Sequence, residues 1–236
     1  MQIAGLIKNS VVDYPGKIAA VVFTPGCNLD CYYCHNRFLL SEETRGDLLP
    51  AEEVLRFLDK RKKLLDGFVI SGGEPTLQED LQEFIQKVKS LGYKIKLDTN
   101  GTNPERLKDL LDSKLLDYVA MDFKAPFLKH GQICGIDAPP VLEKIKESIK
   151  LLLTGPIEYE FRTTFVPELK QEDILEMAEY IQGARLYVLQ QYRMPELPNN
   201  EQLALRLQQY AHSADYIKET ARKAAEMVAV CETRGI

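Results

Sequence analysis

The feature that most constrains the fold is a regular alternation of short apolar runs with longer amphipathic segments. The runs are rich in β-branched and aromatic residues and have the length of strands. Because parallel neighbours need crossover connections, strands that alternate with helices indicate a parallel sheet. The predicted strands cover 18–23, 67–70, 93–97, 116–121, 157–165 and 184–189.

The segments between these strands carry apolar residues at three- and four-residue steps, which is the period of a helix. In one of them, Asn103 suits the N-cap and Pro104 the first turn. Two more helical stretches are expected between 199 and about 229, and the tail, which ends in a short apolar run, MVAVC, is expected to hold a short terminal strand. The other predicted helices cover 51–65, 77–91, 103–111, 139–152 and 170–182.

Six strand–helix units fall short of the eight that close a standard barrel. An open partial (β/α)6 barrel with parallel strands is therefore favoured over a doubly wound flat sheet. The chain has 236 residues, 45% of them hydrophobic, which suffices for one core. We expect a single domain over 1–236, with a core of about 16–192 and a C-terminal helical extension with its short strand over 193–236.

Charge and composition narrow the setting. The net charge of −5 gives no overall attraction to nucleic acid or anionic lipid, and neither is expected as a partner. The N-terminus resembles no secretion signal, and no run approaches the roughly 18 apolar residues of a membrane helix. A cytoplasmic protein is expected. Its five cysteines, an odd number, suit metal binding or chemistry better than disulfides.

Polar residues cluster where the predicted strands end, which is where parallel α/β folds bind their ligands. Arg162 lies within the fifth strand and is costly to bury unless it meets an anion. The segments that follow the other strands are the cysteine loop at 27–34, SGGEPT at 71–76, DTNG at 98–101, DFK at 122–124 and QQYR at 190–193.

Cys27, Cys31 and Cys34 form a C-x3-C-x2-C pattern that can surround one metal centre if the loop folds back, and Gly26 favours such a turn. A structural zinc needs four ligands, and His35 is an awkward fourth beside Cys34. An iron–sulfur cluster normally takes four cysteines, so three would leave one iron open to an outside ligand. Both centres stay open on this pattern.

The cysteine pattern, an aromatic at Tyr33 and the GGE at Gly72, Gly73 and Glu74 resemble the radical S-adenosylmethionine (radical SAM) superfamily. CYYCHN, GGEPTL, DTNG and the Asp-x-Lys of Asp122 and Lys124 are similar to enzymes that install glycyl radicals in partner enzymes. The stretch from GLIKNS to CHN and the later FKAPF look most like activating proteins of anaerobic ribonucleoside-triphosphate reductase. This similarity covers roughly residues 3–192.

The resemblance implies that the three cysteines hold one [4Fe–4S] cluster and that its fourth iron binds SAM. An electron from the reduced cluster would cleave SAM to methionine and a 5′-deoxyadenosyl radical, and this radical would abstract hydrogen from a glycine of the partner, making the enzyme a radical SAM oxidoreductase. An electron donor such as flavodoxin or ferredoxin is implied as well. The alternatives are an activator of the pyruvate formate-lyase type, an enzyme acting on a small molecule or RNA base, and a zinc-stabilised binding module.

Further residues are assigned to SAM by the resemblance, each beside a plainer interpretation. The glycines admit close backbone approach and Glu74 supplies charge or orients the turn, yet a tight turn before a helix explains them too. Asp98 serves equally as a cap, Arg162 as a structural ion pair, and His35 as a packed residue. Cys134 and Cys231 are expected to be buried inert thiols. The complete set of SAM-binding candidates is Tyr33, Gly72, Gly73, Glu74, Asp98, Thr99, Asp122, Lys124, Arg162 and Gln190.

Overall fold

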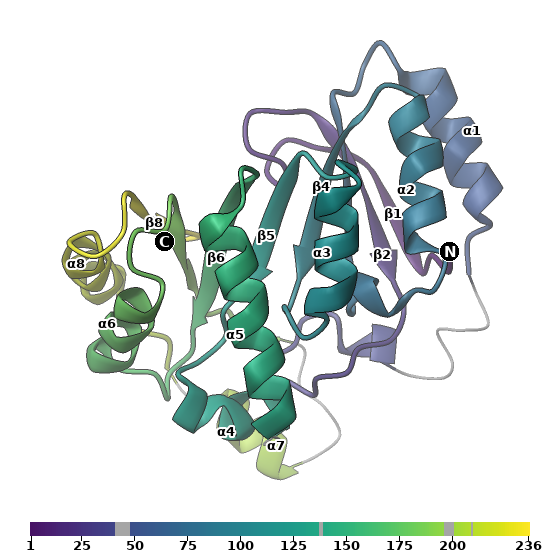
Figure 1. Ribbon diagram of the computed structural model, residues 1–236. Helices are drawn as coiled ribbons and strands as arrows, with labels where there is room; N and C mark the ends of the chain where they lie inside the picture. Colours follow the sequence, from purple (N-terminus) through teal and green to yellow (C-terminus); the bar gives the residue numbers. More distant parts are fainter. Residues whose placement is uncertain (41–47, 137–138, 196–200, 209) are drawn as a thin grey trace. The chain divides into compact units, whose positions relative to one another are not determined.

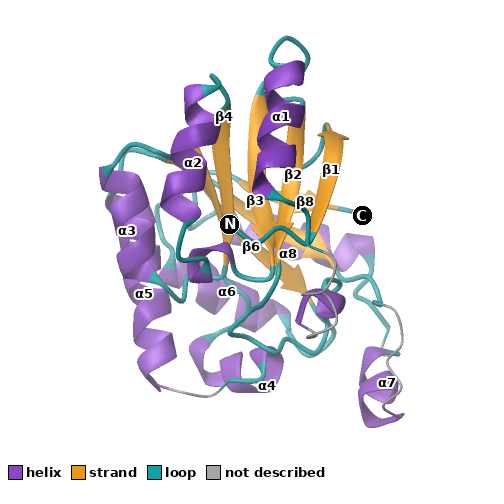
Figure 2. Ribbon diagram, turned by 90° about the vertical axis from the view of Figure 1, so that its right-hand side faces the viewer, coloured by secondary structure: helices purple, strands orange, loops and turns teal. Residues whose placement is uncertain are grey.

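The computed structural model describes the chain except for residues 41–47, 137–138, 196–200 and 209 (Figures 1 and 2). The strands follow one another in the sheet in chain order. β1 pairs antiparallel with β2, whereas β2 to β4 and β6 to β8 pair in parallel. The strands are β1 (Gly5–Ser10), β2 (Ala19–Thr24), β3 (Gly67–Gly72), β4 (Lys94–Thr99), β5 (Tyr118–Asp122), β6 (Glu158–Phe165), β7 (Tyr187–Gln191) and β8 (Cys231–Arg234).

Helices connect the parallel strands, as crossover connections require. The predicted class, an α/β fold of the open partial (β/α)6 barrel type with parallel strands, is thus confirmed. The α-helices are α1 (Ala51–Arg61), α2 (Leu81–Ser90), α3 (Pro104–Asp112), α4 (His130–Cys134), α5 (Pro139–Thr154), α6 (Gln171–Tyr180), α7 (Glu201–Leu207) and α8 (Ala214–Ala224). Short 3-10 helices are η1 (Arg37–Leu40), η3 (Pro75–Leu77) and η4 (Phe127–Lys129).

All six predicted strands are present, with shifted ends, and so are the two predicted helices of the tail. The helix predicted over 77–91 is wrong at its start, because α2 begins only at Leu81. Residues Pro75–Leu77 form η3 instead, where the Glu74 carboxylate accepts the N–H of Thr76 at 3.1 Å. The helix predicted over 51–65 ends early, at Arg61.

The chain forms two compact units. The first comprises Met1–Asn28, Asn36–Ala120 and Pro156–Glu158, and the second comprises Leu29–His35, Met121–Gly155 and Tyr159–Ile236. The single domain over 1–236 stays a prediction.

The core of the first unit is built on nearly continuous buried runs in β2 and β3, the pattern of strands covered on both faces. Helices α1 and α2 are amphipathic, and their apolar stripes are buried. The Tyr93 hydroxyl donates to the carbonyl of Leu58 at 2.7 Å, which ties the start of β4 to α1. The buried residues of the two helices are Val54, Leu58, Leu81, Phe84, Ile85 and Val88.

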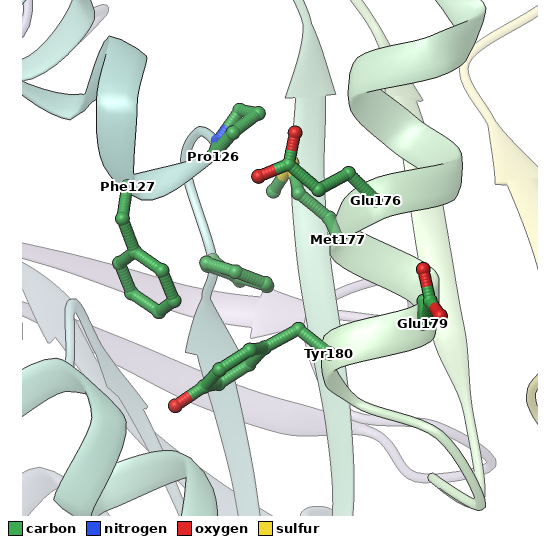
Figure 3. Close-up of a pocket in the computed structure, with 7 residues that line it drawn as sticks. Pro126, Phe127, Glu176, Met177, Glu179 and Tyr180 are labelled. Atoms are coloured by element: carbon green, nitrogen blue, oxygen red, sulfur yellow. The ribbon is translucent and has the colours of Figure 1, made fainter.

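In the second unit, an aromatic cluster fixes the chain just beyond β5 (Figure 3). The rings of Phe127 and Tyr180 meet edge to face, with centroids 4.8 Å apart, and Phe123 is buried against both. Side chains alternate in direction along extended chain. With Phe123 in this cluster, Asp122 and Lys124 therefore point to the other side. A cavity of about 430 Å³ here is lined by Phe123, Pro126, Phe127, Glu176, Met177, Glu179 and Tyr180.

Also in the second unit, β6 and β8 flank β7 and are linked across it by an ion pair whose carboxylate is buried. Glu160 is 1% exposed, and Arg234 donates to its two carboxylate oxygens at 3.0 and 2.6 Å. Such forked pairing satisfies a carboxylate that is otherwise costly to bury.

Among the described residues, no helix combines the length and the apolar character needed to cross a bilayer.

We predict that Arg234→Ala lowers the free energy of unfolding by about 2–3 kcal/mol, because Glu160 stays buried without its forked partner. The matched control is Arg222→Ala in α8, whose side chain is 67% exposed and pairs with Glu219. Solvent screens the attraction within that exposed pair, so this control should leave the free energy of unfolding nearly unchanged. Urea denaturation followed by circular dichroism measures both variants, and equal midpoints for the two would contradict the prediction.

Candidate functional site

In the first unit, the cysteine loop begins where the backbone of Gly26 lies close to that of Gly73. Gly26 donates its N–H to Leu39 at 2.8 Å and accepts the N–H of Glu74 at 2.8 Å. A Cβ on Gly73 would lie 1.9 Å from the Gly26 carbonyl oxygen, and one on Gly72 would lie 2.3 Å from the backbone nitrogen of Thr24. Gly72 also has a φ of 121°, which favours glycine. Both glycines are thus required by the geometry where β2 and β3 end.

Glu74 is fully buried and connects the turn after β3 with the turn after β4 in the first unit. Its carboxylate accepts hydrogen bonds from the hydroxyls of Thr76 and Thr99, at 2.6 and 2.8 Å. The backbone N–H of Asn100 donates to it at 2.7 Å. Burial raises the pKa of Glu74, and these hydrogen bonds oppose that rise. Of the two predicted roles, the structure shows Glu74 orienting the turns after β3 and β4.

Asn100, which sequence reasoning did not single out, positions the first cysteine. Its amide nitrogen donates to the sulfur of Cys27 at 3.7 Å and to Oδ1 of Asn28 at 3.0 Å. Its own Oδ1 accepts the N–H and hydroxyl of Thr102 at 3.0 and 2.7 Å. The DTNG run carries the signal that could have identified Asn100, because this asparagine directly follows the predicted site residues Asp98 and Thr99.

Asp98 and Thr99 have different partners at the end of β4. Asp98 accepts from Nζ of Lys96 at 2.5 Å and from the hydroxyl of Ser71 at 3.0 Å. Lys96 is 2% exposed, so the pair is a buried one. The sequence does hold a signal for this pair, because Asp98 follows Lys96 by two residues and side chains at that spacing lie on the same face of a strand.

In the second unit, the cysteine loop carries Cys31, which is 7% exposed, and the partly exposed Cys34. A hydrogen bond with the thiol of Cys134 lowers the pKa of Cys31 to about 7. The Cys134 carbonyl also accepts the N–H of Asp30 at 2.9 Å. Cys134 is buried, as predicted, and lies against the cysteine loop. Cys231 is only partly buried, which corrects its prediction, and desolvation raises its pKa to about 12.

Asp122 lies between two cations. Its carboxylate accepts from Nε of Arg162 at 2.8 Å and from Nζ of Lys124 at 3.2 Å. Burial raises the pKa of Asp122, but the two positive charges outweigh it and hold that pKa at about 2. Arg162 therefore makes the structural ion pair that was one of its two predicted roles. Together the three side chains carry a net charge of +1.

The predicted site residues fall into two groups, one in each compact unit. Within the parts of the chain that the structure describes, no three His, Cys, Asp or Glu side chains come together as a metal site. The cysteine ligand set therefore stays a prediction. The first unit holds Cys27, Gly72, Gly73, Glu74, Asp98 and Thr99, and the second holds Cys31, Tyr33, Cys34, Asp122, Lys124, Arg162 and Gln190.

A parallel α/β fold with a three-cysteine loop after its first parallel strand defines the class of this protein. The sequence model of the Radical SAM superfamily matches residues 21–181, more than half of the chain. The chain belongs to the radical SAM superfamily, and it is an enzyme of that superfamily.

Two curated relatives illustrate the range of similar proteins. A protein of Methanocaldococcus jannaschii, provisionally named a glycyl-radical enzyme activating enzyme, is 39% identical over 84% of this chain and 83% of its own. GTP 3',8-cyclase of Helicobacter pylori is 30% identical over 76% of this chain. The match spans only 55% of the cyclase, so this chain covers about half of its length.

Solved structures support the fold. Streptococcus suis SuiB bound to its precursor peptide SuiA matches 91% of this chain and 48% of its own, with a TM-score of 0.69 and 18% identity. A structure of TYW1 with a lysine-pyruvate adduct matches 88% of this chain and 73% of its own, with a TM-score of 0.61 and 16% identity. At these identities the likeness concerns the fold alone.

Superfamily membership implies one [4Fe–4S] cluster and SAM, so the cofactor prediction is confirmed. The donor chemistry of this chain fits the cluster. Three thiols lie on one eight-residue loop, and cysteine thiolates are the ligands that hold such clusters.

We predict that the stability contributed by the Asp122 ion pairs is lost in acid. The pKa of Asp122 lies at about 2 in the folded protein, below the value of 3.8 that is usual for an exposed aspartate. Its contribution is therefore complete above the unfolded value and declines as the pH falls toward 2. From pH 5 to pH 3 the stability difference between wild type and Asp122→Asn should shrink by about 1 kcal/mol. Urea titrations at both pH values measure it, and a difference that is constant or larger at pH 3 would refute it.

Proposed function

We propose that this enzyme activates a glycyl-radical enzyme by abstracting hydrogen from a glycine of that partner. The observation that carries the proposal is the 39% identity to the M. jannaschii protein named for this activity. That match extends over 83% of the relative, whereas the match to the H. pylori GTP 3',8-cyclase leaves nearly half of the cyclase uncovered.

In this proposal Cys27, Cys31 and Cys34 hold the cluster. When bound, the cluster and SAM together supply the reductive cleavage that makes hydrogen abstraction possible. The chain's contribution is to hold the ligands. Asn100 directs a hydrogen bond to the sulfur of Cys27, and Cys134 does so to that of Cys31. Hydrogen bonds to ligand sulfurs tune the reduction potential of such clusters.

The remaining predicted residues bind SAM. Gly72 and Gly73 expose backbone groups for the methionyl amine, and the oxygens of Glu74 are already taken up in orienting that turn. The group of Lys124, Asp122 and Arg162 suits the methionyl carboxylate, because it offers the N–H donors of two cations. Tyr33 forms a wall beside the adenine. Asp98, Thr99 and Gln190 complete the proposed set, with Gln190 near the adenine edge.

The partner most consistent with the N-terminal stretch and the FKAPF segment is anaerobic ribonucleoside-triphosphate reductase. A flavodoxin or ferredoxin would supply the electron, which makes the enzyme an oxidoreductase. An activator of the pyruvate formate-lyase type is the nearest alternative. The similarity to the GTP cyclases supports, more weakly, a radical SAM enzyme that acts on a small molecule.

We predict that anaerobic reconstitution gives about four irons and four sulfides per chain, together with 5′-deoxyadenosine when a reductant is added. Single Cys→Ala changes at 27, 31 and 34 should remove most of the iron and all of the 5′-deoxyadenosine. Cys231→Ala is the matched control, since this thiol in β8 has no proposed role. Iron retained in all three loop variants would refute the ligand assignment.

The activase itself is tested by incubating the reconstituted enzyme with a candidate anaerobic reductase, SAM and a reductant. Electron paramagnetic resonance should then show the doublet of a glycyl radical, and that doublet should vanish when the acceptor glycine of the reductase is replaced by alanine. An enzyme that cleaves SAM fully but yields no doublet with any glycyl-radical partner would instead favour the small-molecule alternative.

A further inference from the structure

Tyr32 stands between two of the loop cysteines, Cys31 and Cys34, and is almost completely buried. Its hydroxyl donates to the carboxylate of Glu168, in the segment that follows β6. The guanidinium of Arg206, in α7, stacks over the Tyr32 ring with its carbon 3.7 Å from the centroid. The middle of the cysteine loop is thus held by two side chains remote from it in sequence.

Arg206 also donates hydrogen bonds to the segment after β6 and to α4. Its Nε donates to Oε1 of Glu168 at 2.7 Å, and its Nη2 donates to the carbonyl of Gln132 in α4 at 2.9 Å. A stacked arginine that also makes charge-assisted hydrogen bonds is held more firmly than an exposed ion pair. Four elements therefore converge on this one guanidinium: α7, α4, the segment after β6 and the cysteine loop.

Helix α7 has an anchor of its own. Leu207 is buried, and its carbonyl accepts the hydroxyl of Tyr192, just beyond β7, at 2.9 Å. Arg206 is therefore presented from a fixed position, so its hold on Tyr32 restrains the loop and does not merely follow it. All of these contacts lie within the second compact unit.

We propose that Arg206 is a positioning residue for the cluster, acting through Tyr32 and Glu168 to hold the segment that carries Cys31 and Cys34. The proposal rests on the proposed function, in which these cysteines are cluster ligands. It gives the tail beyond residue 193 a role in the site, where the sequence indicated only a helical extension.

The first test uses the protein without its cluster, so that it does not depend on the ligand assignment. The rate at which iodoacetamide alkylates Cys31 is followed by peptide mass spectrometry. Arg206→Ala should raise this rate about tenfold, because Tyr32 loses the stacked guanidinium and Glu168, which accepts the Tyr32 hydroxyl, loses its bond to Arg206. Arg206→Lys keeps the charge without the planar fork and should give an intermediate rate. Arg222→Ala, a surface change in α8, should match wild type.

Tyr32→Phe removes only the hydroxyl bond to Glu168 and should raise the rate less than Arg206→Ala does. This variant and Arg206→Lys decide the matter if Arg206→Ala does not fold, as judged by circular dichroism. Alkylation rates equal to wild type in the folded variants would overturn the proposal.

The second test uses the reconstituted protein. Arg206→Ala should release iron to a chelator about tenfold faster than wild type and alter the resonance spectrum of the reduced cluster, with partial rescue in Arg206→Lys. A purely structural role for α7 would lower the melting temperature and leave the spectrum unchanged, which would also overturn the proposal. If wild type itself binds no cluster, the proposed function fails, and the alkylation rates alone judge the role of Arg206.

Discussion

In the first unit, the polar turns that follow β2, β3 and β4 depend on one close contact between backbone groups, that of the Gly26 carbonyl with Gly73. A single methyl group at Gly73 would lie 1.9 Å from that oxygen, so the two loops meet as closely as backbone can. Because Gly26 also accepts the N–H of Glu74, this approach fixes the residue whose carboxylate binds Thr76, Thr99 and Asn100. The position of Asn100, and through it the hydrogen bond to Cys27, follows from that arrangement.

The second unit is organised by charge. Lys124, Asp122, Arg162, Glu160 and Arg234 form a series of alternating sign, from the end of β5 to β8. Each charge of this series lies beside one of opposite sign, and Glu232 of β8 continues it, 3.8 Å from Arg234. The C-terminal strand thus supports a site whose proposed ligand-binding residues lie on other strands.

The sequence predicted well what depends on local pattern. Strands β2 to β7 were predicted because their apolar runs are short and rich in β-branched residues. The polar residues at the strand ends were predicted as a site because parallel α/β folds bind ligands at the carboxyl ends of their strands. β1 was missed because its middle, with the exposed Lys8, reads as an edge segment of mixed polarity. The start of α2 was misplaced because Leu77 continues the helical period, although Pro75 and Glu74 close a separate turn there.

Residues that act through a distant partner could not be found in this way. Asn100 and Arg206 are ordinary within their own segments, and each gains its role from contacts with residues far away in sequence, among them Cys27 and Tyr32 respectively. The same holds for Cys134, which has no metal-binding spacing of its own yet hydrogen-bonds the thiol of Cys31.

The chain passes from the first unit to the second between Asn28 and Leu29, inside the cysteine loop. Cys27 is therefore held by hydrogen bonds of one unit, and Cys31 with Tyr32 by those of the other. Each such bond is worth only about 1 kcal/mol, far less than the packing of a core strand. These anchors are individually weak, and the proposed cluster would add its own bonds to the three thiols.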